Sequence, residues 1–208
     1  MKHIITRYLA IIALLTAGTA NAEVTANIGW DSEYIFRGVP QSDSSAFGGV
    51  DYANGGFYVG TWAADVGQGS EVDLYLGYVH EFEGGFSLGL GGTLYEYTDD
   101  FDARYTEEKY YGAYSYIGLE YTVGTYDNFG LGDQDYDFLA LSFEYEGFSG
   151  TYGTFGDDFD GDYLQFGYST TIADVDAHLD VIFSSDDLIG TDDTSIIFGI
   201  SKSFTLSE

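Results

Sequence analysis

From Val24 to Phe204 the chain consists of short segments in which apolar and polar residues alternate, separated by turns rich in glycine and aspartate. A period of two is the side-chain period of a β-strand, because successive side chains point to opposite faces. We therefore expect strands with one apolar and one polar face. In the first segment, which we expect to continue through Arg37, the apolar phase holds Val24, Ala26, Ile28, Trp30, Tyr34 and Phe36, and the polar phase holds Thr25, Asn27, Asp31, Glu33 and Arg37.

The connections between the expected strands alternate between long and short. The long ones are 38–44, 98–104, 129–135, 156–161 and 184–193, and the short ones include Asn54-Gly55-Gly56, Glu83-Gly84-Gly85 and Glu146-Gly147. Long loops on one rim and tight hairpin turns on the other are typical of outer-membrane barrels, whereas a water-soluble sandwich has no reason to sort its loops. The aromatic load of 20 Tyr, 16 Phe and 2 Trp and the single proline favour the same interpretation. The sequence predicts an all-β fold, a transmembrane antiparallel up-and-down β-barrel of about 12 strands, with 10 or 8 as alternative counts.

Residues 1–22 have the pattern of a cleaved signal peptide. Lys2 and Arg7 precede a short apolar run, and Ala20-Asn21-Ala22 is a small-residue cleavage site. The apolar run is shorter than the ~20 residues that a membrane-spanning helix needs. We therefore expect one barrel domain at 23–208, in the outer membrane of a Gram-negative bacterium.

Charge excludes one class of function. Lys2 and Arg7 account for two of the six Lys and Arg residues, so the mature chain would carry four cations against 35 carboxylates, a net charge of 4 − 35 = −31. Nucleic-acid binding depends on cations that neutralise phosphates, so it is excluded as a function. The chain has no cysteine and hence no disulfide or thiolate site.

The segment Ser32-Glu33-Tyr34-Ile35-Phe36-Arg37-Gly38-Val39-Pro40-Gln41 resembles the S-x-Y-x-F-R-G-x-x-Q signature of the TorF-like porin family, which also carries the label Gcw_chp for an uncharacterised family. The similarity continues through residues 56–62 and 71–78, and Ser201–Phe204 also fits. The resemblance implies an outer-membrane barrel, whose partners would be outer-membrane lipid, lipopolysaccharide, the barrel assembly machinery and small solutes. It implies no particular substrate.

Arg37 is the sharpest single candidate for a role in the barrel interior. It could line a constriction and set which ions pass, since charged groups tune the selectivity of pores. The alternative is an internal salt bridge, with Glu33 or with a carboxylate of a neighbouring strand, that helps to plug a narrow barrel. The full set of candidate pore-lining residues is Arg37, Glu33, Asp31, Asp73, Glu120, Glu144, Asp176, His178 and Asp180.

Two acidic patterns suggest metal ions. Asp176, His178 and Asp180 share one polar face, where a metal or proton-transfer site competes with ordinary polarity of the interior. Asp158, Asp160 and Asp162 alternate as in calcium loops but lack the distal glutamate of an EF-hand. The sequence predicts no cofactor beyond weakly bound Ca²⁺ or Mg²⁺ at such acidic loops.

These observations favour a porin or channel for passive diffusion of small hydrophilic solutes, cationic or neutral. The first alternative is a narrow structural or adhesive barrel without transport, whose bore Tyr75, Tyr110, Tyr114 and Phe138 would block. An outer-membrane enzyme is the third interpretation. We identify no catalytic residues, because no nucleophile and base are paired in the sequence, and we expect the protein not to be an enzyme.

Overall fold

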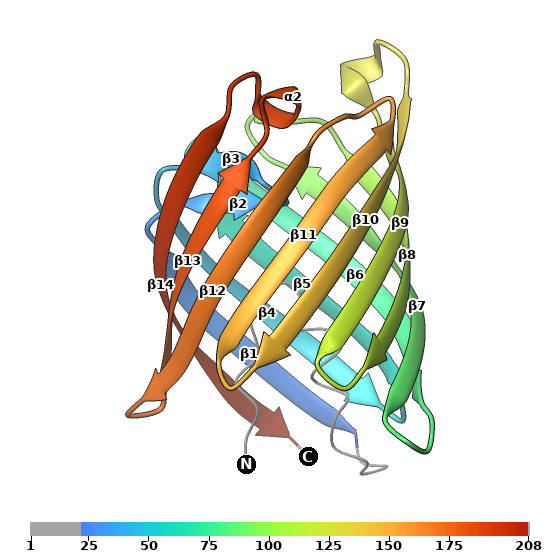
Figure 1. The fold of residues 1–208 in the computed structure, drawn as a ribbon, viewed down its shortest axis with the longest axis vertical. Helices are drawn as coiled ribbons and strands as arrows, with labels where there is room; N and C mark the ends of the chain where they lie inside the picture. Colours follow the sequence, from blue (N-terminus) through green and yellow to red (C-terminus); the bar gives the residue numbers. More distant parts are fainter. Residues whose placement is uncertain (1–21, 208) are drawn as a thin grey trace.

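The computed structural model describes residues 22–207, and it shows a closed barrel of twelve antiparallel strands (Figure 1). The signal-peptide prediction therefore falls outside the described residues, except for Ala22. The barrel strands are β1 (Glu23–Asp31), β4 (Ser45–Asn54), β5 (Phe57–Asp65), β6 (Ser70–Glu81), β7 (Phe86–Tyr97), β8 (Tyr105–Tyr114), β9 (Ile117–Tyr126), β10 (Gln134–Tyr145), β11 (Phe148–Asp157), β12 (Asp162–Ile172), β13 (Val175–Ser184) and β14 (Asp193–Ser207). The predicted fold class and strand count are confirmed.

Each barrel strand pairs with the barrel strands before and after it in the chain, and β1 pairs with β14 to close the sheet. The closing register places Trp30 opposite Ile200 and Asp31 opposite Gly199. Closure leaves no barrel strand with an unpaired edge, which would be costly both in water and in lipid.

The two rims differ as the loop lengths predict. At the short-turn rim, hairpins such as Asn54-Gly55-Gly56 reverse the chain with positive φ angles of 57° at Gly55 and 90° at Gly56. The opposite, long-loop rim holds the connections at 66–69, 98–104, 127–133, 158–161 and 185–192. A 3₁₀ turn, η1 (Asn128–Gly130), and a short helix, α2 (Asp186–Ile189), lie in two of these loops (Figure 1).

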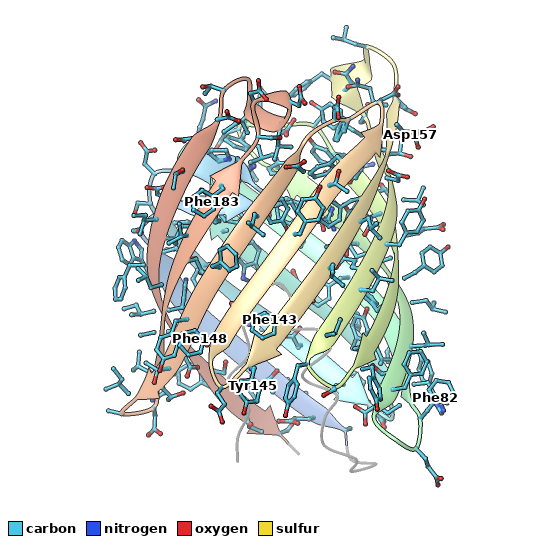
Figure 2. All side chains as sticks on the ribbon, in the orientation of Figure 1. Phe82, Phe143, Tyr145, Phe148, Asp157 and Phe183 are labelled. Atoms are coloured by element: carbon cyan, nitrogen blue, oxygen red, sulfur yellow. The ribbon has the colours of Figure 1, made fainter. Side chains whose placement is uncertain are left out.

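The two faces of the sheet differ as the alternation predicts. On β6, Leu74 is 52% exposed on the outer surface, whereas Glu71 is fully buried inside the barrel. Figure 2 shows Phe143, Phe148 and Phe183 on the outer surface as well, and all three are exposed. Among residues 22–207, no helix has the length and apolarity needed to cross a bilayer.

The first predicted segment is wrong beyond Asp31. Strand β1 ends there because a side chain replaces the backbone in the next pair of bonds with β14. The Ser32 N–H still donates to the Phe198 carbonyl at 2.8 Å, but the Phe198 N–H donates to Ser32 Oγ at 2.9 Å. Strands β2 (Tyr34–Phe36) and β3 (Val39–Ser42) then form a separate hairpin, drawn inside the barrel in Figure 1. Tyr34 and Phe36 therefore do not lie on the outer surface.

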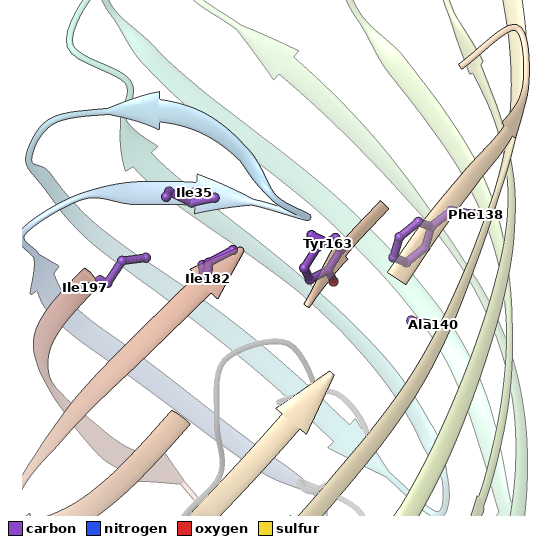
Figure 3. Packing of buried hydrophobic residues seen from close by; sticks show 6 residues of the cluster. All are labelled: Ile35, Phe138, Ala140, Tyr163, Ile182 and Ile197. Carbon is purple, nitrogen blue, oxygen red and sulfur yellow. The ribbon is translucent and has the colours of Figure 1, made fainter. Parts of the chain in front are cut away.

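The hairpin is part of the apolar core of the barrel. Ile35, only 2% exposed, belongs to a buried cluster with Tyr163, Ile182 and Ile197, which project inward from β12, β13 and β14 (Figure 3). A second cluster joins Tyr34 to Ala64 and Val66 at the end of β5. An apolar residue enclosed in this way lies away from water, so both clusters favour the inward position of the hairpin.

Two of the four aromatic residues expected to block the bore face the other way. Tyr75 and Phe138 point inward, but Tyr110 is 48% exposed and Tyr114 is 62% exposed on the outer surface. The reason is the phase of β8, whose inward positions are occupied by Glu107, Lys109 and Tyr111.

Candidate pore constriction

The β2–β3 hairpin narrows the interior of the barrel and brings Arg37 to its middle. The turn between the two short strands consists of Arg37, with a φ of 47°, and Gly38, with a φ of 83°. A side chain at Gly38 would meet Tyr163 and Leu188 at 2.7 and 2.8 Å, so the close approach of the turn to the wall requires glycine. The Ser184 hydroxyl donates to the Gly38 carbonyl at 2.7 Å and fixes the turn to β13.

Arg37 is buried and makes ion pairs with two different strands. Its Nη1 lies 2.5 Å from Oε1 of Glu107 on β8, and its Nη2 lies 2.8 Å from Oε1 of Glu120 on β9. Its guanidinium also lies over the Phe138 ring, 4.1 Å from the centroid. A planar guanidinium can bond two carboxylates and stack on a ring at once, which a lysine cannot.

Glu107 is the centre of this network. Besides Arg37, it accepts hydrogen bonds from the hydroxyls of Tyr95 at 2.8 Å and Tyr136 at 2.7 Å, and it pairs with Lys109 Nζ at 2.9 Å. Lys109 in turn donates to the Tyr95 hydroxyl at 2.7 Å. Four groups thus satisfy one buried carboxylate, which is the condition under which a buried charge is tolerated.

The interior beside the hairpin therefore contains opposite charges that are paired with each other. Arg37 and Lys109 supply two positive charges, and Glu107 and Glu120 supply two negative charges. Of the two interpretations of Arg37, an internal salt bridge is present, but its partners are Glu107 and Glu120 of β8 and β9 instead of Glu33. Glu33 lies in the bend before β2 and is half-buried.

The other predicted pore-lining residues also lie on the inner side of the barrel. Asp73 is buried on β6, and Glu144 is half-buried near the short-turn end of β10. His178 connects β13 to β1, because its Nε2 lies 3.2 Å from Asp31 Oδ1 and 3.6 Å from Asp180 Oδ2. Asp176 accepts a hydrogen bond from the Thr171 hydroxyl at 2.6 Å, near the short-turn rim.

The acidic loop at Asp158, Asp160 and Asp162 does not converge on one point. The Asp158 carboxylate accepts from the Asp135 N–H, that of Asp160 accepts from the Gly161 N–H, and that of Asp162 accepts from the Tyr152 hydroxyl. Within residues 22–207, no group of three or more histidine or acidic residues is arranged to hold a metal ion. Weak Ca²⁺ or Mg²⁺ binding at this loop stays a prediction.

Sequence reasoning missed Glu107, Lys109, Tyr95 and Tyr136 as residues of the network. A signal existed for the first two, since a glutamate and a lysine two residues apart share the inward phase of β8. Charged residues on the inward phase of a barrel strand need a partner across the interior.

Several solved structures have a similar fold, among them the following three. The KdgM porin has a TM-score of 0.59 and 10% identity, over 86% of this chain and 99% of that chain. A KdgM porin structure in complex with disordered oligogalacturonate has a TM-score of 0.57 and 10% identity, over 88% and 99%. A structure from work on the in-meso crystallization of membrane proteins has a TM-score of 0.60 and 10% identity, over 89% and 85%. At such identities the likeness concerns the fold alone.

In sequence, no curated protein is detectably similar. A family model described as "Bacterial protein of unknown function (Gcw_chp)" matches residues 16–179, which include the hairpin, its ion-pair partners and most of the barrel strands. The chain therefore belongs to the Gcw_chp family.

Proposed function

We propose that the protein is an outer-membrane pore for passive diffusion of small hydrophilic solutes, and that the β2–β3 hairpin forms its constriction. The observation that carries the proposal is the pairing of an apolar outer surface with a charged interior in one closed barrel. A soluble protein would bury the apolar face and expose the charges, whereas a barrel in lipid does the reverse. The fold shared with the KdgM porin supports the same interpretation.

We expect cations and neutral solutes to be preferred. Around Arg37 the two cations are paired with two carboxylates. Carboxylates dominate the long-loop rim, where Asp99, Asp100, Asp157, Asp158, Asp186, Asp187, Asp192 and Asp193 gather. A cleft lined by one sign of charge concentrates ions of the opposite sign. The proposal is non-enzymatic, and the fold shared with porins supports it.

The proposal includes an orientation and partners. Short-turn rims of such barrels face the periplasm and long loops face outside, so α2 would lie at the cell surface. Outer-membrane lipid, lipopolysaccharide and the barrel assembly machinery are the expected partners. We also propose that the chain is a TorF-like porin, because residues 32–41 resemble the signature of that family.

Planar-bilayer recording of the refolded protein tests the proposal. We expect discrete conductance steps and a reversal potential that reports cation preference, which shrinks as salt shortens the Debye length from ~10 Å at 0.1 M to ~3 Å at 1 M. Arg37→Ala removes a positive charge from the constriction and should increase the cation preference. Lys202→Ala, on the outward phase of β14 near the short-turn rim, should leave it unchanged. Anion preference in the parent protein would reject the charge argument.

A structural barrel without transport is the second candidate, and one observation favours it. The hairpin is packed into the interior through Ile35 and fixed through Arg37, so it could close the bore. Absence of conductance in protein that is folded, as judged by its altered gel mobility before boiling, would favour this second candidate over the pore.

A further inference from the structure

A cavity of about 310 Å³ lies on the long-loop side of the hairpin. Its floor is formed by Phe36, Arg37 and Val39 of the hairpin, and its walls come from β7, β8, β10, β11 and the loops at 98–104, 158–161 and 185–192. The volume is at the lower end of the ~300–1,000 Å³ range of small-molecule pockets. The cavity therefore has room for one small organic molecule.

The walls of the cavity are mainly aromatic. Tyr136 and Phe159 are stacked, with ring centroids 4.7 Å apart and planes inclined by 3°, and Tyr105 meets both rings edge-on at 6.2 and 6.4 Å. Phe155 packs against Phe159 at 6.1 Å. Each ring is held by its neighbours, so the aromatic surface that faces the cavity is already in place before a ligand arrives.

The charged groups of the cavity are mostly anionic. Asp102, Asp160 and Asp187 line it, and its single lining cation, Arg37, is already paired with Glu107 and Glu120. Asp102 accepts hydrogen bonds from the hydroxyls of Tyr105 at 3.0 Å and Tyr126 at 2.8 Å. A phenol that donates to a carboxylate becomes more electron-rich, which makes its ring face a better partner for a cation.

We propose that this cavity binds a small organic cation with an apolar surface, such as an alkylated ammonium ion. Aromatic faces attract a cation whose charge is spread over methyl groups, and the negatively charged carboxylates attract the same cation. An anionic sugar would stack on the same rings but would be repelled by the three aspartates. A neutral apolar molecule would gain nothing from the carboxylates.

The site would supply the first binding step of the proposed pore, and to that extent it rests on the proposed function. The test of the site does not depend on the proposed function, because binding is measured on the refolded protein in detergent without any membrane current. Conductance without binding would overturn the site and leave the pore standing. Binding without conductance would support the site and contradict the proposed pore function.

Isothermal titration calorimetry with choline tests the site. We expect saturable binding with a Kd of about 1 mM or below, and binding of dimethylbutanol, in which carbon replaces the charged nitrogen, to be weaker by about 2-fold to 30-fold. Galacturonate should not bind. Equal affinity for choline and dimethylbutanol, or no choline binding to folded protein, would overturn the proposal.

Variants locate the binding in this cavity. Phe159→Ala should weaken choline binding by about 2-fold to 30-fold, and Phe159→Tyr should restore it. Phe129→Ala, which removes an exposed ring from the same rim outside the cavity, is the matched control and should bind as the parent does. Asp187→Asn provides a second variant that leaves the rings intact and should weaken choline binding without changing that of dimethylbutanol. Unchanged choline affinity in both Phe159→Ala and Asp187→Asn would also overturn the proposal.

Discussion

The two sides of the β2–β3 hairpin are held by different forces. On the apolar flank, formed by β12, β13 and β14, Ile35 joins Tyr163, Ile182 and Ile197 in a buried cluster. On the polar flank, formed by β6, β8 and β9, Arg37 pairs with Glu107 and Glu120, and the Tyr34 hydroxyl donates to Glu71 at 2.7 Å. Apolar packing is non-directional, whereas the bonds of the polar flank fix position and charge. The apolar flank therefore holds the hairpin against the barrel wall, whereas the polar flank sets the charge of the constriction.

Glu107→Gln should have the largest effect on the polar flank. It leaves Lys109 without its ion pair and Arg37 with one carboxylate in place of two, and removal of one partner from a buried pair costs about 3–5 kcal/mol. Urea unfolding of the refolded barrel measures the loss. Glu108→Gln, the outward neighbour on the same strand, should change stability by less than about 0.5 kcal/mol. A loss equally small in Glu107→Gln would contradict the importance of the polar flank.

Ile35→Ala tests the apolar flank and should cost about 2–5 kcal/mol, because it removes buried methyl groups and leaves a cavity. Most of this free energy should be lost from the packing of the hairpin against the wall. The hairpin should therefore detach more often, and trypsin should cleave after Arg37 faster than in the parent. Ile196→Ala, on the outer surface, serves as the control in detergent. Ion selectivity of Ile35→Ala should equal that of the parent. A changed selectivity would show that the two flanks are not separable.

Tyr34→Phe tests one bond of the polar flank, because it removes the hydrogen bond to the buried Glu71 carboxylate and keeps the ring. The expected cost is about 1.5–3 kcal/mol, as for hydrogen bonds to charged groups. Tyr110→Phe makes the same change on the outer surface and should be close to neutral. Urea midpoints of the two variants measured side by side decide the point, and equal midpoints would argue against a role for the Tyr34 bond.

Ser184→Ala should have the smallest effect, about 1 kcal/mol, because it removes a neutral hydrogen bond to the Gly38 carbonyl. Its cleavage rate after Arg37 should lie between those of the parent and Ile35→Ala. Ser203→Ala, near the end of β14, is the control. Cleavage faster than in Ile35→Ala would mean that the turn is held chiefly through its backbone and that the apolar flank contributes less than Ser184 does.

The barrel could be predicted from sequence because its pattern is local and repeated. Residues such as Leu74 and Glu71 are assigned to their faces by alternation alone, and glycines mark the turns. The hairpin could not be predicted in this way. Tyr34 and Phe36 continue the phase of β1, and only the bonds of Ser32 with Phe198 reveal that the strand has ended.

The network around Arg37 could not be predicted from sequence for a different reason. Its partners Glu107 and Glu120 are 70 and 83 residues away, and many other carboxylates had the same inward phase. Distant pairs of this kind depend on the tilt and register of the whole barrel, which periodicity along single strands does not contain.

The pairing of β1 with β14 has a consequence for the order of assembly. The hairpin follows directly on the first barrel strand, and the wall that surrounds it is complete only when the last strand has paired with the first. Once that seam is sealed, the hairpin can enter or leave only along the barrel axis, through one of the two rims. Sealing of the seam is thus also the step that captures the hairpin, and a seam that closes early would produce a barrel with an empty interior.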